Sequence, residues 1–208
     1  TAGLRKEKNV NHRELENVAN HRAISALEKA DVCFVMIDAL HGLEKQDINI
    51  ISLALSRNKG VVILINKWDS VEKDDKTHLD YIEHLENRMN LPMKLPVHFV
   101  SALERTRLIK ALQEGQAVYE NRHQRLPTSR LNDVMLPAIE HNPPPSVHGQ
   151  LVRIKYVTQL DEDKLTIGFF CNHPKAIGKP YQKFLERTLR KHFHLKGVPV
   201  KLVFKAKS

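Results

Sequence analysis

The sequence has little cysteine and no long apolar run. Its 208 residues include only two cysteines, Cys33 and Cys171, each inside an apolar stretch of strand length. Two such thiols lack the spacing of metal ligands and suit a reducing compartment better than a disulfide framework. We therefore predict a cytoplasmic protein without a metal site. No apolar stretch approaches the roughly 18 residues of a membrane-spanning helix, so no membrane span is expected.

A phosphate-binding loop of the form G-x-x-x-x-G-K-[ST] is also missing. Lys59-Gly60 and Gly178-Lys179 lack the loop around them. That loop would supply the N–H groups that cradle phosphates and the hydroxyl that holds Mg²⁺. We therefore expect the 208 residues alone to bind a nucleotide poorly and not to hydrolyse it, and we predict no catalytic residue among them. Because the sequence starts without methionine, we expect it to begin inside a longer protein.

Basic charge is concentrated in the second part of the chain. Residues 1–121 carry 17 Lys and Arg against 18 Asp and Glu, whereas residues 122–208 carry 16 against 6. A small domain with this excess attracts polyanions, and we place nucleic acid first among them. The alternative is a basic face that only keeps the domain soluble.

Residues 1–121 alternate between short apolar runs and helical periodicity. Continuously apolar runs are typical of parallel strands covered on both faces, and strands are predicted at residues 32–37, 61–65 and 97–100. Helical spacing predicts helices at residues 14–29, 44–57, 75–89 and 104–121. The alternation predicts an α/β domain with a parallel sheet and right-handed crossovers.

Residues 122–208 follow a different order. Helices are predicted at residues 126–140 and 180–194, and strands at residues 150–158, 164–172 and 200–204. A stiff proline-rich connection, Asn142-Pro143-Pro144-Pro145-Ser146, follows the first helix. The order α-β-β-α-β predicts a separate α+β domain.

The strongest chemical motif is Asn66-Lys67-Trp68-Asp69, directly after the predicted strand at residues 61–65. Ligands of open α/β sheets bind at the carboxyl ends of the strands. The Asp69 carboxylate can accept hydrogen bonds from the ring N–H and the exocyclic amine of guanine, a donor pair that adenine lacks. Asn66 can tie loops together, and the Lys67 stem can lie over the ring. The alternative is a polar turn in which Asp69 caps the next helix.

Ser101-Ala102-Leu103 ends the next predicted strand. A small residue there lets a backbone N–H approach the carbonyl of the base. Three residues alone are a weak signal and usually mark only a turn, but they are much more informative behind the Asn66 motif, with one predicted helix between the two segments. The two segments together therefore predict a guanine nucleotide site.

The motif order resembles the Der (EngA) family of bacterial tandem-domain GTPases. The resemblance covers nearly the whole chain and is carried by Thr1-Ala2-Gly3-Leu4-Arg5, Asp38-Ala39, Glu44-Lys45-Gln46-Asp47, Asn66-Lys67-Trp68-Asp69, Tyr119-Glu120-Asn121, Pro127-Thr128-Ser129-Arg130-Leu131-Asn132 and Val198-Pro199-Val200-Lys201-Leu202-Val203-Phe204. It implies an incomplete P-loop GTPase-type domain at residues 1–121, the C-terminal part of a second GTPase domain without phosphate loop and first switch. A basic KH-like domain at residues 122–208 would follow.

This resemblance implies a function for the intact protein, namely GTP hydrolysis coupled to maturation of the large ribosomal subunit. The implied ligands are GTP and GDP, with Mg²⁺ held by residues that this chain lacks. The implied partners are ribosomal RNA of the large-subunit precursor and a first GTPase domain of the same protein. The implied nucleotide-binding residues are Gly3 at the terminal phosphate and, at the base, Asn66, Lys67, Asp69, Ser101, Ala102 and Leu103.

The sequence departs from the family pattern at one segment and from ordinary KH domains at another. Glu104-Arg105-Thr106-Arg107 stands where the family usually has a glycine-rich turn. No glycine of the basic domain begins the G-x-x-G loop with which ordinary KH domains clamp RNA. We therefore expect docking on folded ribosomal RNA that depends mainly on phosphate contacts, made by Lys179, Lys183, Arg187, Arg190 and Lys191. The alternative is that these five side chains form only a solvated helix face. Phe169, Phe170, Tyr181 and Phe184 are expected in the core.

Two other functions remain open. A non-enzymatic ribosomal RNA-binding module with a degenerate α/β domain would bind RNA in a salt-dependent way and ignore GTP. A GTPase similar to Era would also carry a C-terminal KH domain, but that domain would be expected to show the missing G-x-x-G loop.

Overall fold

The computed structural model describes residues 24–206 except 73, 75, 92, 147, 148, 150, 162 and 163. The chain divides into two compact units, Thr1–Tyr119 and Glu120–Ser208, called here the N-terminal and C-terminal units. The predicted helix at residues 14–29 is helical over residues 24–29, and its remainder lies outside the described residues, as does Gly3. In the part of the chain that is described, no helix has the length and apolarity needed to cross a membrane.

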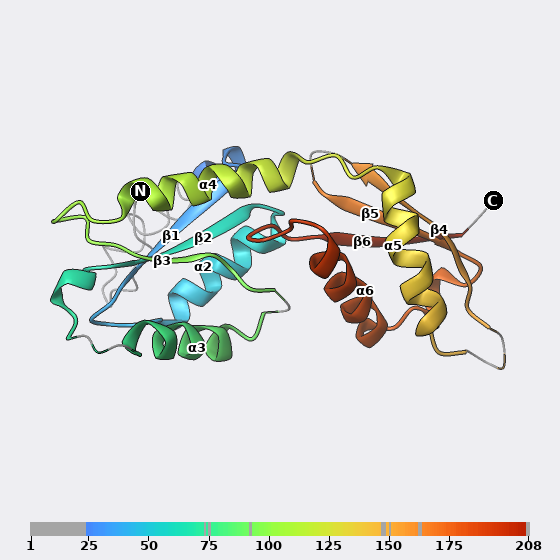
Figure 1. Cartoon of the computed structure of the whole chain (residues 1–208), viewed down its shortest axis with the longest axis horizontal. Coiled ribbons are helices and arrows are strands. Elements are labelled where there is room, and N and C mark those ends of the chain that lie inside the picture. The colour runs from blue at the N-terminus through green and yellow to red at the C-terminus, as the bar shows by residue number, and fades with distance from the viewer. Residues whose placement is uncertain are drawn as a thin grey trace, which may run out of the picture. The chain divides into compact units, whose positions relative to one another are not determined.

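A three-stranded parallel sheet forms the centre of the N-terminal unit (Figure 1). Its order is β1-β2-β3, with β1 (Val32–Asp38) and β3 (Val97–Phe99) on either side of β2 (Gly60–Asn66). The helices are α2 (Lys45–Ser56), α3 (Thr77–Met89) and α4 (Leu108–His123), with a one-turn helix η1 (Trp68–Ser70) after β2. The predicted parallel α/β architecture is confirmed.

Helices cover both faces of this sheet, which explains the continuously apolar strands. Alternate residues of β1 and β2 join α2 and α3 in one buried cluster that includes Val35, Ile63 and Leu85. On the other face, Phe34 and Gly60 lie against α4. Figure 1 shows α4 on one side of the sheet and α2 and α3 on the other. This layering leaves the carboxyl ends of the strands as the edge where a ligand can bind.

The last helix of the N-terminal unit begins four residues later than predicted. Ser101 and Thr106 form an isolated antiparallel bridge instead of a first helical turn. Arg105 and Arg107 have φ values of 57° and 60°, in the left-handed region. Non-glycine residues enter that region at an energetic cost and do not continue a right-handed helix there. The segment that departs from the glycine-rich family pattern is therefore a tight turn.

The C-terminal unit has its own three-stranded sheet, in the order β4-β5-β6. The central strand β5 (Thr166–Cys171) pairs antiparallel with β4 (Ile154–Asp161) and parallel with β6 (Lys201–Ala206). The helices α5 (Thr128–His141) and α6 (Lys179–His192) contact each other, and α5 also contacts β4. A short helix η2 (Pro174–Ala176) precedes α6, and the predicted α-β-β-α-β order is confirmed.

The C-terminal sheet has a bulge in β4, and the neighbouring aromatic residues of β5 lie on opposite faces. Ile154 pairs with Cys171 and Tyr156 with Phe170, so Lys155 is an extra residue on β4. Phe169 is fully buried and stacks on Phe204 with ring centroids 5.4 Å apart. Phe170, which we expected in the core, is only half-buried, and its ring contacts the exposed Tyr156.

Candidate guanine site and basic helix

Asn66, the last residue of β2, links the two segments predicted to read guanine. Its side-chain Oδ1 accepts a hydrogen bond of 3.0 Å from the Ala102 N–H, in the loop after β3. A second bond runs from the Trp68 N–H to the Val100 carbonyl at 3.1 Å. Parallel strands end at the same edge of a sheet, and these two bonds hold the segments together there.

Lys67 crosses from β2 to the end of β1. Its backbone is left-handed, with φ 61° and ψ 32°, and its Nζ lies 2.6 Å from Asp38 Oδ2. The hydrogen bond from Lys67, helped by one from the Leu40 N–H at 2.9 Å, lowers the pKa of Asp38 to about 2. Asp38 was not among the predicted site residues. The signal in the sequence was a carboxylate at the end of an apolar strand.

Trp68 anchors the turn that carries Asp69. The indole is buried, with its ring centroid 4.2 Å from that of Phe99 and 5.8 Å from that of Tyr81. Asp69 is half-buried, and its Oδ2 accepts a hydrogen bond of 2.9 Å from the Ser70 hydroxyl. An aromatic anchor in the core therefore positions a carboxylate at the strand edge, as a base-reading group requires.

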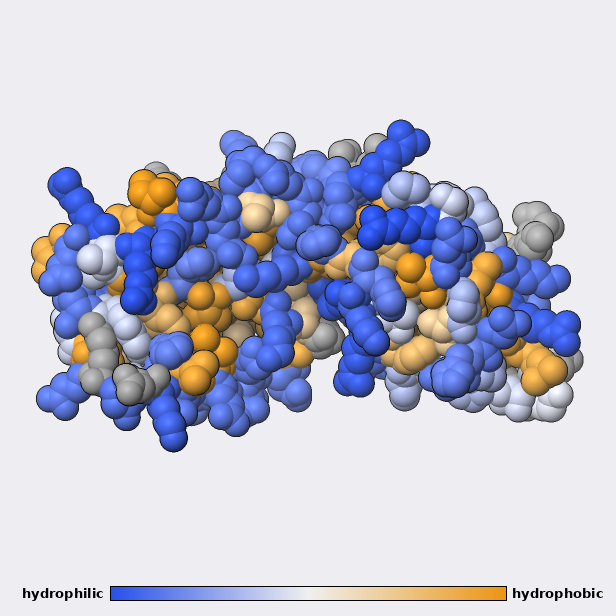
Figure 2. Space-filling view, viewed as in Figure 1, coloured by the Kyte–Doolittle hydropathy of each residue, from blue (hydrophilic) through white to orange (hydrophobic). Residues whose placement is uncertain are grey.

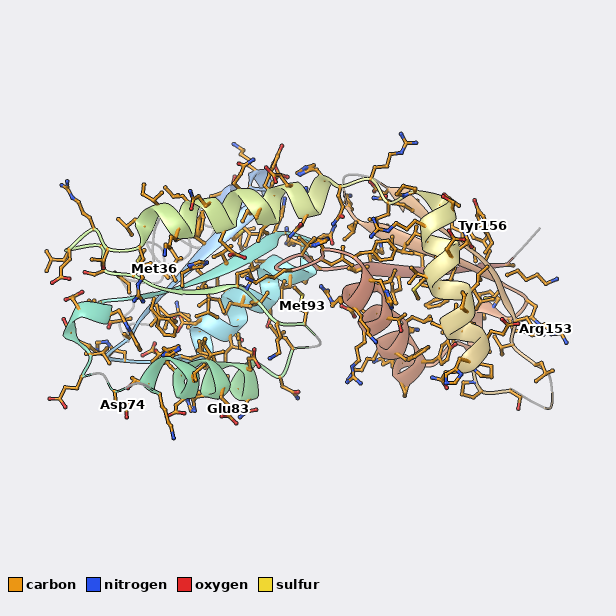
Figure 3. The ribbon with its side chains drawn as sticks, in the orientation of Figure 1. Met36, Asp74, Glu83, Met93, Arg153 and Tyr156 are labelled. Carbon is orange, nitrogen blue, oxygen red and sulfur yellow. The ribbon has the colours of Figure 1, made fainter. Side chains whose placement is uncertain are left out.

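The alternative in which Asp69 only caps the next helix is wrong. Helix α3 begins at Thr77. Asp74, labelled in Figure 3, accepts hydrogen bonds from the backbone N–H groups of Lys76 at 2.9 Å and Thr77 at 2.7 Å. These bonds lower the pKa of Asp74, the bond from the Thr77 side chain most of all. Asp74, and not Asp69, therefore accepts the hydrogen bonds of the N–H groups at the start of α3.

Ser101 fixes the loop on the other side of the candidate site. Its side chain is buried, and its hydroxyl accepts a hydrogen bond of 3.1 Å from the Glu104 N–H. Ala102 and Leu103 are exposed. The Ala102 N–H donates its hydrogen bond to Asn66, so a contact with the base carbonyl would have to come from another N–H of this loop. Ser101 and Asn66 thus hold the loop after β3 in place, and Ala102 and Leu103 lie on its exposed side.

The polar groups at the strand edge are compatible with a guanine base beside the Asp69 carboxylate. Asp69 offers acceptor oxygens at the strand edge, and Lys67 lies across the same edge with an exposed aliphatic stem. In the described ranges, no group of three or more His, Cys, Asp or Glu side chains could hold a metal ion. The polar groups of Asp69 and Lys67 at this edge are therefore the candidates for contact with a base.

Helix α6 carries an exposed basic stripe. Tyr181, Leu185 and Leu189 form its buried face. Four cations at intervals of four residues lie exposed on the opposite side: Lys179, Lys183, Arg187 and Lys191. In Figure 2, strongly hydrophilic residues lie over part of the α6 position, beside paler and more hydrophobic ones. These four side chains are called the α6 stripe below.

Arg190, the fifth cation predicted to contact RNA, is engaged inside the unit. Its guanidinium donates to Glu186 Oε1 at 2.7 and 2.9 Å, and to the carbonyls of Leu195 at 2.8 Å and Val198 at 3.0 Å. Only 15% of its side chain is exposed. Because Arg190 ties α6 to the segment before β6, we leave it out of the proposed RNA contacts.

Known families match both units. Residues 20–143 match the elongation factor Tu GTP binding domain, and residues 125–205 match the KH-domain-like C-terminal domain of EngA bacterial GTPase enzymes. The chain is 44% identical over 207 residues to GTPase Der of Amoebophilus asiaticus, covering 100% of this chain and 48% of the relative. It is also 44% identical over 208 residues to GTPase Der of Cytophaga hutchinsonii, covering 100% and 47%. The chain belongs to the Der (EngA) family.

This Der-family chain spans about half the length of the curated relatives it matches. Among solved structures, Era in complex with MgGDPNP and nucleotides 1506-1542 of 16S ribosomal RNA matches with a TM-score of 0.48 and 20% identity. That match covers 99% of this chain and 74% of that one. The family predicted from the motif order is confirmed, and so is its KH-like C-terminal domain.

Proposed function

We propose that the chain combines the guanine-reading part of a GTPase domain with a KH-like RNA-binding domain. The intact protein is then a cytoplasmic GTPase of large-subunit ribosome assembly. The observation that carries the proposal is the 3.0 Å hydrogen bond between Asn66 and Ala102, which joins the two segments predicted to read the base. The membership in the Der family supports GTP as the nucleotide.

In this proposal, Asp69 selects the base. Its carboxylate accepts hydrogen bonds from the ring N–H and the amine of guanine, while adenine would leave the carboxylate oxygens without these donors. The stem of Lys67 covers one face of the ring, and the Asp38 carboxylate holds its ammonium at 2.6 Å. Ser101 and Asn66 keep the wall formed by Ala102 and Leu103 in place.

Hydrolysis requires groups that the 208 residues do not contain. A phosphate-binding loop and a magnesium-binding hydroxyl would position and polarise the phosphates of GTP. The sequence has no G-x-x-x-x-G-K-[ST] motif. The 208-residue chain is therefore expected to show no GTPase activity, whereas the intact protein hydrolyses GTP.

The C-terminal unit contributes the RNA contact. Residues 122–208 carry 16 Lys and Arg against 6 Asp and Glu, and the α6 stripe places four exposed cations on one helix face. Cations on one face neutralise phosphates of folded RNA without reading sequence. The partners in this proposal are ribosomal RNA of the large-subunit precursor and a further GTPase domain of the same protein.

The base-reading step is tested by Asp69→Asn in the intact protein. An amide at this position donates to the second carbonyl of xanthine, so the preference for guanine over xanthine nucleotides should reverse. The measurement is hydrolysis of GTP and XTP by wild type, by Asp69→Asn and by the control Asp80→Asn, an exposed carboxylate of α3. An unchanged preference in Asp69→Asn contradicts the assignment.

The RNA contact is tested by charge reversal on the α6 stripe. Lys183→Glu combined with Arg187→Glu should weaken binding to duplex ribosomal RNA. It should also lower the slope of the logarithm of the binding constant against the logarithm of the salt concentration, by about one unit per lost phosphate contact. The matched control is Lys45→Glu with Arg88→Glu, two exposed cations of the N-terminal unit. If RNA binding by the intact protein ignores GTP, the non-enzymatic alternative is favoured instead.

A further inference from the structure

The side of the C-terminal sheet away from its buried core carries exposed aromatic and basic side chains. Val157, Ile167 and Phe169 are fully buried. Strand residues with the opposite orientation lie on the other face, of which Tyr156, Phe170, Val203, Lys205 and Leu160, which lies over Gly168, are called here the open sheet face. Tyr156 is 41% exposed and Leu160 is 37% exposed. This face is distinct from the α6 stripe, because α6 buries its apolar side in the core.

Two aromatic rings lie side by side on the open sheet face. The centroids of Tyr156 and Phe170 are 5.7 Å apart, with their planes tilted by 57°. The sheet register continues this row to Lys205, because Phe170 pairs with Lys205 on β6. The β4 bulge adds Lys155 beside Tyr156. A regular strand would lack this extra residue, so the bulge brings an additional cation to the aromatic pair.

The charge around the aromatic pair favours a polyanion as the occupant. Lys155, Lys205 and Arg153 are exposed at this end of the sheet, and Figure 3 shows Arg153 and Tyr156 on the segment that leads into and begins β4. The acidic segment that starts at Asp161 follows the other end of β4. Lysine is depleted in protein–protein interfaces, whereas aromatic rings flanked by cations are typical of surfaces that bind single-stranded nucleic acid.

We propose that Tyr156 and Phe170 form a stacking platform for an unpaired RNA base, with Lys155 and Lys205 holding the adjacent phosphates. This inference rests on the proposed RNA-binding function and adds a second contact to it. The α6 stripe binds folded RNA through phosphates, and the open sheet face binds an unpaired nucleotide. The chain therefore recognises a junction where a duplex meets a single-stranded segment.

The test uses the whole chain with two probes, a short unstructured fluorescein-labelled RNA and a blunt duplex RNA. Tyr156→Ala should weaken binding of the unpaired RNA about tenfold and leave duplex binding unchanged. Tyr156→Phe should keep wild-type affinity because it keeps the ring. Tyr119→Ala is the matched control, since Tyr119 is 42% exposed on α4 in the other unit. Fluorescence anisotropy gives each affinity.

Tyr156→Trp provides a readout that does not depend on a loss of affinity. Stacking of a base on the new indole should quench its fluorescence when unpaired RNA is added, and duplex RNA should not. The platform is overturned if both Tyr156→Ala and Phe170→Ala keep wild-type affinity for unpaired RNA and the Tyr156→Trp fluorescence is not quenched. If Lys183→Glu with Arg187→Glu still weakens duplex binding in that case, the proposed function stands alone. If the wild-type chain binds neither probe, both proposals fail.

Discussion

Asn66 Oδ1 and the Ala102 N–H lie 3.0 Å apart, although 36 positions separate the two residues in the chain. The bond is possible because β2 and β3 are parallel neighbours, so both strands end at one edge of the sheet. In the proposed function, Asn66 is therefore a positioning residue that acts on the base through the loop it holds.

Replacing Asn66 should damage the site more than the fold. Asn66→Ala removes the acceptor of the Ala102 N–H, and because Ala102 is exposed, water can replace the bond. We expect a loss of about 1 kcal/mol in the free energy of unfolding and a roughly tenfold loss in guanine nucleotide affinity of the intact protein. Denaturant unfolding and equilibrium binding measure the two effects.

The matched control for this substitution is Asn49→Ala, on the exposed side of α2. It should change neither quantity by a measurable amount. Equal nucleotide affinity in Asn66→Ala and Asn49→Ala would show that the bond to Ala102 does not organise the site.

The ion pair of Lys67 with Asp38 predicts a specific pH dependence. The pKa of Asp38 is lowered to about 2 in the folded chain, against roughly 4 for an ordinary aspartate. The stability that comes from this carboxylate is thus present above about pH 4 and is lost as the pH falls toward about 2. Lys67→Met should be less stable than wild type at neutral pH, and the difference should close between these two pH values.

Two measurements check the Lys67 prediction. Thermal unfolding as a function of pH follows the stability difference, and NMR titration of the Asp38 carboxyl should show a higher pKa in Lys67→Met than in wild type. Lys45→Met, which removes an exposed lysine of α2, should leave the Asp38 titration unchanged. A stability difference that persists at the lowest pH would point to lost packing of the Lys67 stem instead.

Much of the architecture could be predicted because hydrophobic pattern and burial correspond closely here. The β2 run from Val61 to Ile65 is buried at every position, and a continuously apolar run predicts this. The position of Asn66 at the end of that run followed directly. The bond to Ala102 could not be predicted, since periodicity indicates where strands lie along the chain and not which strands or atoms meet.

Features that depend on single backbone conformations were not predictable from periodicity. The bulge at Lys155 inserts one residue into β4, although the sequence there shows only alternation. Similarly, the left-handed Arg105 ends the expected first turn of α4. Arg190 has the spacing of a surface cation, and only the fold shows that the carbonyls of Leu195 and Val198 accept its hydrogen bonds.

Arg190 and Arg187 should give opposite results although both are arginines of α6. Arg190→Met leaves Glu186 and two carbonyls without their donor, which should lower the free energy of unfolding by about 2 kcal/mol. Arg187→Met removes an exposed side chain and should change stability by no more than about 0.5 kcal/mol. RNA affinity should show the reverse order, with a loss in Arg187→Met only. Urea unfolding and RNA anisotropy on the two variants decide between structural and binding roles, and a stable Arg190→Met that binds RNA weakly would restore Arg190 to the RNA contacts.

Gly60 marks a close approach between β2 and α4. A Cβ at this position would lie 2.6 Å from Val118 Cγ1 and 3.2 Å from Val32 Cγ2. Val118 is fully buried and has no room to move away. Gly60→Ala should therefore destabilise the N-terminal unit by about 1–3 kcal/mol, even though alanine is less costly than glycine inside a strand.

A double-mutant cycle separates this clash from other effects of Gly60→Ala. Val118→Ala alone leaves a cavity and should cost about 2 kcal/mol, but it also removes the atom that the new Cβ would meet. Combined with Gly60→Ala, the total loss should be smaller than the sum of the single losses by about 1 kcal/mol or more. Gly178→Ala is the control, because its nearest neighbour would be Pro180 Cδ at 3.6 Å, an ordinary contact. Strictly additive losses in the cycle would mean that α4 does not press on the start of β2, and the strand would then depend on its other neighbours for its position.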